Sequence, residues 1–269
     1  MDKSVKNLNV RLRTIRIRDL IVGIIIALIL TILVAAVFPV IDNSEDLFYI
    51  VFLLFVTLLF VWALRGAKGL DRNFEQLFEN DTKKEILIVF ATNLLFAFFV
   101  TFLISYLDIL MGIGDPNWIS MWDVGTVDID SSVILLDAIG AIIFAPLIEE
   151  LIFRGVLFNR LKIRTGILPA MIISSFIFAI GHEFGGITSA FLFGMCMCIL
   201  YLKTDNILVP MSVHFLNNVV ATISSNLGID PIVSQLPWIL PATIITIIGT
   251  VYLIRYIIRE YKSLKKRYG

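Results

Sequence analysis

One apolar stretch of the sequence carries three charged side chains within six positions. It reads APLIEELIFRG, and its charged residues are Glu149, Glu150 and Arg154. A charged group in the core of a bilayer costs about 2.5–3.5 kcal/mol on insertion scales, so a charge retained there is a candidate for function. Residues four apart share a helix face, and Glu150 can therefore pair with Arg154. Glu149 lies about 100° further around the helix and is free to face a different cavity.

The two histidines of the chain also lie in apolar runs. His182 is in SFIFAIGHEFGG, and His214 is in VPMSVHFLNNVV. Phe178 comes one helical turn before His182, where its ring can shield the imidazole from lipid. Asn218 follows His214 by four residues, so the two side chains are predicted to share a face. Taken singly, such residues are often only links between helices, but together they indicate a site.

This set of side chains fits the hydrolysis of a peptide bond. The reaction needs an activated water molecule and a stabiliser for the tetrahedral oxyanion. A glutamate in a partly dry site can act as the general base, and a histidine beside it can orient the water. Histidine and asparagine donors aimed at the developing oxyanion are strong in a medium of low dielectric.

A metal site is the alternative chemistry for the same residues. One carboxylate and two histidines with a bound water form a reasonable catalytic zinc set, here Glu149, His182 and His214. The spacing is not that of the HExxH motif, although His182 is directly followed by Glu183. Direct activation of water by the carboxylate is favoured, and zinc is kept as the alternative cofactor.

The elements that must position these side chains are predicted to be membrane-spanning helices. Hydrophobic residues make up 58% of the chain, whereas soluble domains are about 45–50% apolar. The net charge is zero, and no nucleic-acid partner is expected. Continuous apolar runs predict an all-α polytopic bundle of about eight transmembrane helices in the cell membrane. The predicted spans are 20–41, 47–64, 86–107, 132–161, 167–184, 187–203, 206–224 and 238–258.

The basic residues alternate between successive loops. Lys and Arg gather in 1–19, 65–84, 160–164, at 203 and in 255–267, whereas the loops 42–46, 108–131 and 225–237 contain none and hold acids instead. Because cytoplasmic loops are rich in Lys and Arg, both termini are predicted to lie in the cytoplasm. Arg154 is the one basic residue that breaks the alternation.

The depths of three candidate residues converge in this arrangement. Glu149 lies sixteen residues before Thr165, at a predicted hairpin turn, and His182 lies seventeen after it. At 1.5 Å per residue, Glu149 is about 15 Å inside the membrane if its helix leaves near Asn159. His214 is about 12 Å inside by the same rise. The sequence therefore predicts one layer that contains all three side chains.

The three motifs resemble those of the CPBP family, which comprises CAAX proteases and bacteriocin-processing enzymes and is also called the Abi family. The EExxxR motif of that family is matched by Glu149, Glu150 and Arg154. The FxxxH motif is matched by Phe178 and His182, and the HxxxN motif by His214 and Asn218. The resemblance covers about residues 130–225.

The resemblance implies an intramembrane endopeptidase that cuts a membrane-associated peptide or protein within the lipid bilayer. It implies that Glu149 activates water together with His182, and that His214 and Asn218 stabilise the oxyanion. Glu150, Arg154 and Phe178 would support the site. Bacterial relatives act in peptide maturation or bacteriocin self-immunity, and the Ile-, Lys- and Asn-rich composition favours a bacterial member.

Three segments organise this prediction along the chain. Residues 1–130 hold three helices and an external loop, 131–225 hold the catalytic core, and 226–269 hold the last helix and a basic tail. A non-catalytic membrane scaffold that regulates a partner such as a sensor kinase is the alternative function. A proton-coupled carrier is a third, but the sequence shows no internal repeat of the kind that such carriers have.

Overall fold

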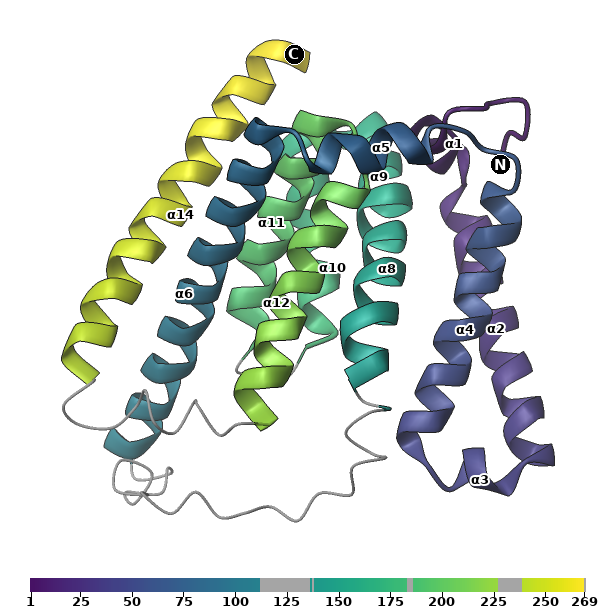
Figure 1. Ribbon diagram of the computed structural model, residues 1–269, viewed down its shortest axis with the longest axis horizontal. Coiled ribbons are helices and arrows are strands. Elements are labelled where there is room, and N and C mark those ends of the chain that lie inside the picture. Colours follow the sequence, from purple (N-terminus) through teal and green to yellow (C-terminus); the bar gives the residue numbers. More distant parts are fainter. Residues whose placement is uncertain (112–135, 137, 183–185, 227–238, 269) are drawn as a thin grey trace.

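The computed structural model of the chain describes residues 1–111, 136, 138–182, 186–226 and 239–268, and this part is built from helices without a strand (Figure 1). The first half contains α1 (Leu8–Thr14), α2 (Ile17–Val37), α3 (Pro39–Asp42), α4 (Glu45–Leu64), α5 (Leu70–Leu77) and α6 (Asn80–Leu110). The second half contains η2 (Gly140–Phe144), α8 (Ala145–Glu150), η3 (Leu151–Phe158), α9 (Asn159–Thr165), α10 (Ile167–Ile180), α11 (Ile187–Thr204), α12 (Leu208–Asn226) and α14 (Ile239–Tyr268). The predicted all-α fold is confirmed.

The outer helices present apolar side chains to the surroundings. On α2, Ile21, Ile25 and Leu33 are each at least half exposed, at 51%, 50% and 57%. Soluble proteins rarely expose so continuous an apolar surface, and a bilayer accounts for it. Within the described residues, α2, α4 and α11 are long and apolar enough to cross a membrane, and α10 and α12 are shorter apolar helices. The total of eight spans stays a prediction.

Helix α11 is the centre of the bundle. It contacts α6, α10, α12 and α14. Its second half, from Cys196 to Tyr201, is at most 1% exposed. Both cysteines of the chain lie in this segment and are free and buried. Figure 1 shows α6 and α14 on one side of this core and the pair α2–α4 on the other.

A cluster of buried amides joins the helices at one end of the bundle. The Asn206 amide donates to the Asn73 carbonyl at 2.7 Å, and the Asn9 side-chain oxygen accepts the Ile207 backbone N–H at 3.2 Å. The Asn9 amide also donates to the Asn73 side chain at 3.3 Å. These bonds fix the start of α12, the helix that carries His214, against α1 and α5. Both ends of the chain lie at this end of the bundle (Figure 1).

The predicted helix 132–161 differs from a plain α-helix. Its beginning lies outside the described residues, and its described part is interrupted by the π-helices η2 and η3 on either side of α8. Such wide turns occur frequently at functional sites. The predicted helix 167–184 ends earlier than expected, because α10 stops at Ile180 with Gly181 as its C-cap. His182 therefore lies in the turn that follows the helix.

Candidate active site

A buried carboxylate connects two of the three predicted motifs. The Glu150 oxygen Oε1 accepts a hydrogen bond from Arg154 Nη1 at 2.9 Å and lies 3.0 Å from His214 Nδ1. The side chains of Glu150 and Arg154 are 0% exposed, and that of His214 is 4% exposed. Buried charges are retained when they are paired and hydrogen-bonded. Glu150 therefore holds both its ion-pair partner and the imidazole of α12.

Glu149 faces the other nitrogen of the same imidazole. Its Oε2 lies 3.8 Å from His214 Nε2, and its side chain is 26% exposed. Because a carboxylate at Nδ1 favours a proton on that nitrogen, the Nε2 lone pair of a neutral His214 points towards Glu149. A water molecule can lie within hydrogen-bonding distance of two polar atoms that are separated by this distance. Glu149, unlike Glu150, has open space beside it.

Phe178 packs against three members of the candidate site. Its ring lies 4.7 Å from that of His182 and 5.8 Å from that of His214 between centroids. The guanidinium carbon of Arg154 lies 4.5 Å from the same ring, a cation–π geometry. Phe178 is 2% exposed. The shielding role expected for it extends to both histidines and the arginine.

The Asn218 amide is engaged with the backbone of the glutamate-bearing segment. It donates to the carbonyl of Ala141 at 2.8 Å. In a π-helix that carbonyl would accept from the residue five positions later, which is Pro146, and proline has no N–H. Asn218 therefore supplies the hydrogen bond that the proline cannot, and it ties α12 to η2 eight residues before Glu149.

His182 takes a looser position than the other candidates. Its Nδ1 lies 3.1 Å from the Phe178 carbonyl, and its side chain is largely exposed. No ion pair of 4.0 Å or less joins it to Glu149 among the described residues. The structure thus brings Glu149 and His214 together and leaves His182 at the edge of the site.

Two residues of α11 belong to the site but carry no signal in the three motifs. Phe193 lies 5.1 Å from the His214 ring and 6.1 Å from that of Phe178. Gly194 lets α11 approach α10, because a Cβ there would lie 2.8 Å from the Ser175 Cβ and 3.1 Å from Arg154 Nη2. Small residues at close helix contacts are typical of membrane bundles. In the sequence, only the glycine within FLFGM indicates this close contact, and a single glycine in an apolar helix is too common to predict a site.

The three residues named for zinc do not form a three-ligand site in this structure. Among the residues that the structure describes, no three His, Cys, Asp or Glu side chains are grouped closely enough to hold a metal ion. Of the three, Glu149 and His214 are within 3.8 Å of each other.

The comparisons with known proteins concern the region that contains this site. Residues 131–220 match the family described as type II CAAX prenyl endopeptidase, Rce1-like. The Bacillus subtilis (strain 168) protein named "Putative membrane peptidase YdiL" is 32% identical over 93 residues, which are 34% of this chain and 38% of that protein. The chain thus matches well under half the length of this relative. No solved structure matches the chain.

Fold and site define a helical membrane protein with a carboxylate–imidazole pair buried in its core. The family match covers the segment that carries all three motifs, from Glu149 to Asn218. Together with the relative named as a membrane peptidase, it supports the CPBP family membership that the motifs predict.

Proposed function

We propose that the chain is an intramembrane endopeptidase that hydrolyses a peptide bond with a water molecule activated by Glu149. The observation that carries the proposal is the pairing of the accessible Glu149 carboxylate with Nε2 of the buried His214 at 3.8 Å. The match to CAAX prenyl endopeptidases over the same residues supports this reaction class.

The proposed reaction begins with one proton transfer. Glu149 takes a proton from the water as the water oxygen attacks the scissile carbonyl carbon, and the carbonyl π electrons move to its oxygen. The tetrahedral intermediate then collapses, the C–N bond breaks, and Glu149 returns the proton to the leaving amine. Hydrolysis thus consumes one water and restores the carboxylate.

His214 assists this reaction from a fixed orientation. With its Nδ1 proton directed at Glu150, the Nε2 atom of the neutral ring orients the water beside Glu149. Glu149 can pass the proton taken from the water to this nitrogen, which then donates it in a hydrogen bond to the developing oxyanion, and the proton returns through Glu149 to the leaving amine. Arg154 pairs with Glu150 at 2.9 Å and fixes the carboxylate that keeps the imidazole aligned.

His182 and Asn218 complete the proposal in different ways. His182 Nδ1 contacts the Phe178 carbonyl, and its Nε2 is proposed to bind water or the substrate backbone. One of the two amide hydrogens of Asn218 is committed to Ala141, which leaves the second for an oxyanion. Their roles as water-orienting and oxyanion-stabilising groups follow from the family motifs.

The substrate class follows from the location of the site. A carboxylate within an apolar bundle is reached from the lipid or from the membrane interface, so the substrate is a membrane-associated peptide or protein. Peptide maturation and bacteriocin self-immunity are the processes proposed for such an activity. A scaffold that binds its partner without cutting it is the alternative.

Comparison of peptides between matched strains tests this proposal. Strains that express the wild-type chain or Glu149→Gln are compared by mass spectrometry of their membrane-associated and secreted peptides. We expect at least one product to disappear in Glu149→Gln and its uncut precursor to accumulate.

The matched control is Glu79→Gln, which makes the same substitution at an exposed glutamate and should leave the products unchanged. Identical peptides in all three strains, with function retained in Glu149→Gln, would favour the scaffold. Addition of a chelator to membranes from the wild-type strain, together with metal analysis of the purified protein, tests whether hydrolysis proceeds without a metal, as proposed.

A further inference from the structure

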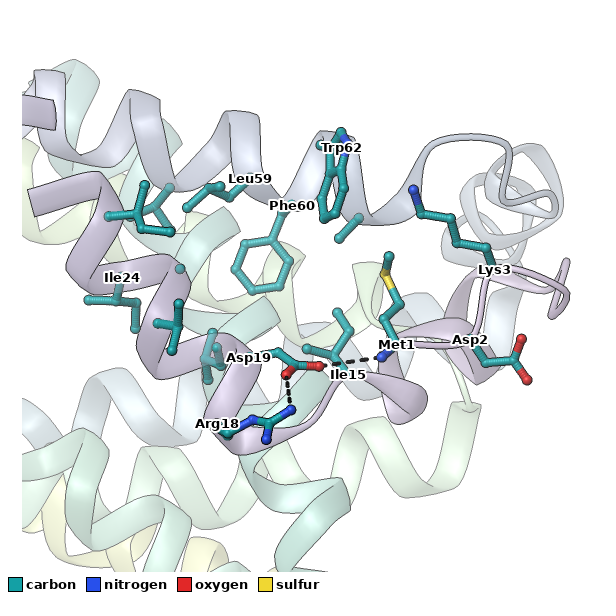
Figure 2. A pocket seen from close by; sticks show the side chains of 16 residues that line it. Met1, Asp2, Lys3, Ile15, Arg18, Asp19, Ile24, Leu59, Phe60 and Trp62 are labelled. Carbon is teal, nitrogen blue, oxygen red and sulfur yellow. Dashed lines mark hydrogen bonds and ion pairs between the residues drawn. The ribbon is translucent and has the colours of Figure 1, made fainter.

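A cavity separate from the candidate active site lies between α2 and α4, beside the N-terminal segment (Figure 2). Its volume is about 830 Å³, within the range of roughly 300–1,000 Å³ that small-molecule sites have. Its walls are apolar and include Ile24, Leu59 and Phe60. None of the residues that line it belongs to the three motifs.

The mouth of this cavity carries charged groups. Three are cationic, namely the Met1 ammonium, Lys3 and Arg18, and two are the carboxylates of Asp2 and Asp19, so one positive charge is in excess. Asp19 is shared by the Met1 ammonium at 3.4 Å and by Arg18 at 3.6 Å. The Arg18 side chain is 77% exposed. The mouth thus has cationic donors available to a ligand.

The segment that forms the mouth is fixed in place. The guanidinium of Arg11, which is 2% exposed, donates to the backbone carbonyls of Lys3, Val5 and Arg65 at 2.6 Å, 2.9 Å and 2.6 Å. The Lys3 ammonium lies 4.3 Å from the centroid of the Trp62 ring. Lys3 is therefore held at the opening, by its backbone carbonyl on Arg11 and by its ammonium on Trp62.

The depth of the cavity corresponds to one leaflet of a bilayer. Its lining on α2 runs from Arg18 to Ile26, a rise of eight residues or about 12 Å. Its lining on α4 runs antiparallel, from Ala63 near the mouth to Val56 at the far end. Half of the hydrocarbon core of a bilayer is about 15 Å thick. A ligand that fills the cavity therefore extends from the interface to the middle of the membrane.

We propose that this cavity binds one acyl chain of an anionic glycerophospholipid, whose phosphate group lies against Lys3 and Arg18. The apolar walls match an alkyl chain, their depth matches one leaflet, and the excess positive charge at the mouth matches an anionic headgroup. Trp62, which is 58% exposed at the same level, occupies the position usual for a tryptophan at a membrane interface. The proposal does not depend on the proposed hydrolysis.

Lipid binding to the purified full chain tests this site. The protein in a neutral detergent is stripped of lipid and then titrated with phosphatidylglycerol or with phosphatidylcholine of the same acyl chains, and bound lipid is counted by native mass spectrometry. We expect a single phosphatidylglycerol bound more tightly than phosphatidylcholine. The double variant Lys3→Glu with Arg18→Glu should bind it about tenfold more weakly or worse.

Two further variants separate the parts of the site. Gly23→Phe places a ring towards Leu59, 3.5 Å from the position of a Cβ at residue 23, and should reduce the binding of both lipids. Lys84→Glu with Arg164→Glu, two exposed charge reversals elsewhere, should leave binding unchanged.

Glu149→Gln should also bind lipid like the wild type, so failure of the hydrolysis and failure of lipid binding can be told apart. The proposal is overturned if the wild type binds phosphatidylglycerol and phosphatidylcholine equally tightly. It is also overturned if the Lys3→Glu, Arg18→Glu variant binds phosphatidylglycerol as tightly as the wild type does. Preferential retention of a lipidated peptide over phosphatidylglycerol would contradict it as well.

Discussion

Glu150 and Glu149 are neighbours in the sequence, yet their surroundings assign them different tasks. Glu150 is fully buried and shares one oxygen between Arg154 and His214. Glu149 is a quarter exposed and faces the opposite nitrogen of the same imidazole. A carboxylate with fixed partners orients a neighbour, whereas one with open space beside it can exchange a proton with water. The proposed division of labour follows from this difference.

The pairing of Glu150 with Arg154 predicts a coupled response to substitution. Arg154→Met leaves the Glu150 charge buried without its cation and should destabilise the fold by about 3–5 kcal/mol. Glu150→Gln combined with Arg154→Met removes both charges and should recover a large part of that loss. The measurement is the unfolding of purified variants in detergent, with the exposed Arg164→Met as the control. Additive effects of the two substitutions would contradict the pairing.

The motif residues could be predicted from the sequence because charges and histidines in apolar runs are conspicuous. Their pairing along one helix, Glu150 with Arg154, followed from four-residue spacing alone. The contact of Glu150 with His214 could not be predicted, since it depends on how α8 and α12 cross. The sequence predicted a common depth for Glu149 and both histidines but did not constrain the distances between their helices, and the 3.8 Å from Glu149 Oε2 to His214 Nε2 is known only from the structure.

At the scale of elements, the π-helices on either side of α8 are what sets the register of the site. Pro146 removes an N–H within the wide turn, and Asn218 of α12 donates to the Ala141 carbonyl instead. A continuous apolar run with one proline gives no indication of such a turn, because the widening depends on a partner from another helix. The prediction of a helix over 132–161 therefore agrees with the described residues, but the two π-helical segments within it were not predicted.

The bond from Asn218 predicts a rescue that a purely catalytic role would not show. Asn218→Ala removes the side-chain donor from the partly buried Ala141 carbonyl and should cost about 1 kcal/mol of stability. Pro146→Ala restores a backbone N–H in the wide turn, so the double variant should regain stability and part of the activity. Thermal unfolding and cleavage rate are measured together. Activity that stays lost while stability returns would show that Asn218 acts on the oxyanion instead of on the backbone.

A charged cluster joins α6, α11 and α14 near one end of the bundle. Lys203 binds Glu85 and lies 2.8 Å from Glu260, and Tyr256 donates to Glu85 at 2.7 Å. Burial raises the pKa of Glu260, but the hydrogen bond and charge of Lys203, together with those of Arg259, outweigh burial and lower it. The ionised form of Glu260 is therefore favoured in the folded protein.

The lowered pKa of Glu260 predicts acid-sensitive stability. A carboxyl group whose pKa is lower in the folded than in the unfolded state stabilises the fold above the unfolded pKa, near 4.3, and this contribution is lost as the pH falls through the folded pKa. Melting temperatures measured from pH 7 down to pH 3 should fall less steeply for Glu260→Gln than for the wild type. Parallel curves for the two proteins would contradict the prediction.

At the scale of the whole molecule, the fold class could be predicted from composition and from continuous apolar runs. Among the described residues, each of the eight predicted spans is mostly helical, with breaks at Phe38, at Gly181–His182 and at Asn206–Ile207. Periodicity cannot say which helices pack together, because nearly every face of these helices is apolar. The central place of α11 therefore emerges only from the structure, as do the close approach at Gly194 and the cavity between α2 and α4.

Both ends of the chain lie at one end of the bundle, and the distribution of Lys and Arg predicts that this end faces the cytoplasm. Cysteine labelling tests the prediction, because the two native cysteines are 0% exposed and should not react. In intact cells an impermeant maleimide should label Asn43→Cys but not Lys265→Cys, and both should react after the cells are opened. Labelling of Lys265→Cys in intact cells would contradict the orientation.

The most direct test of the central claim is the rate at which the purified protein, reconstituted in lipid vesicles, cuts the peptide identified by the strain comparison. General acid–base catalysis typically contributes about 10²–10⁴-fold, so Glu149→Gln should cut at least about 100-fold more slowly than the wild type while it unfolds at a similar temperature. Cleavage at the wild-type rate by a folded Glu149→Gln protein would contradict the assignment of Glu149 as the base.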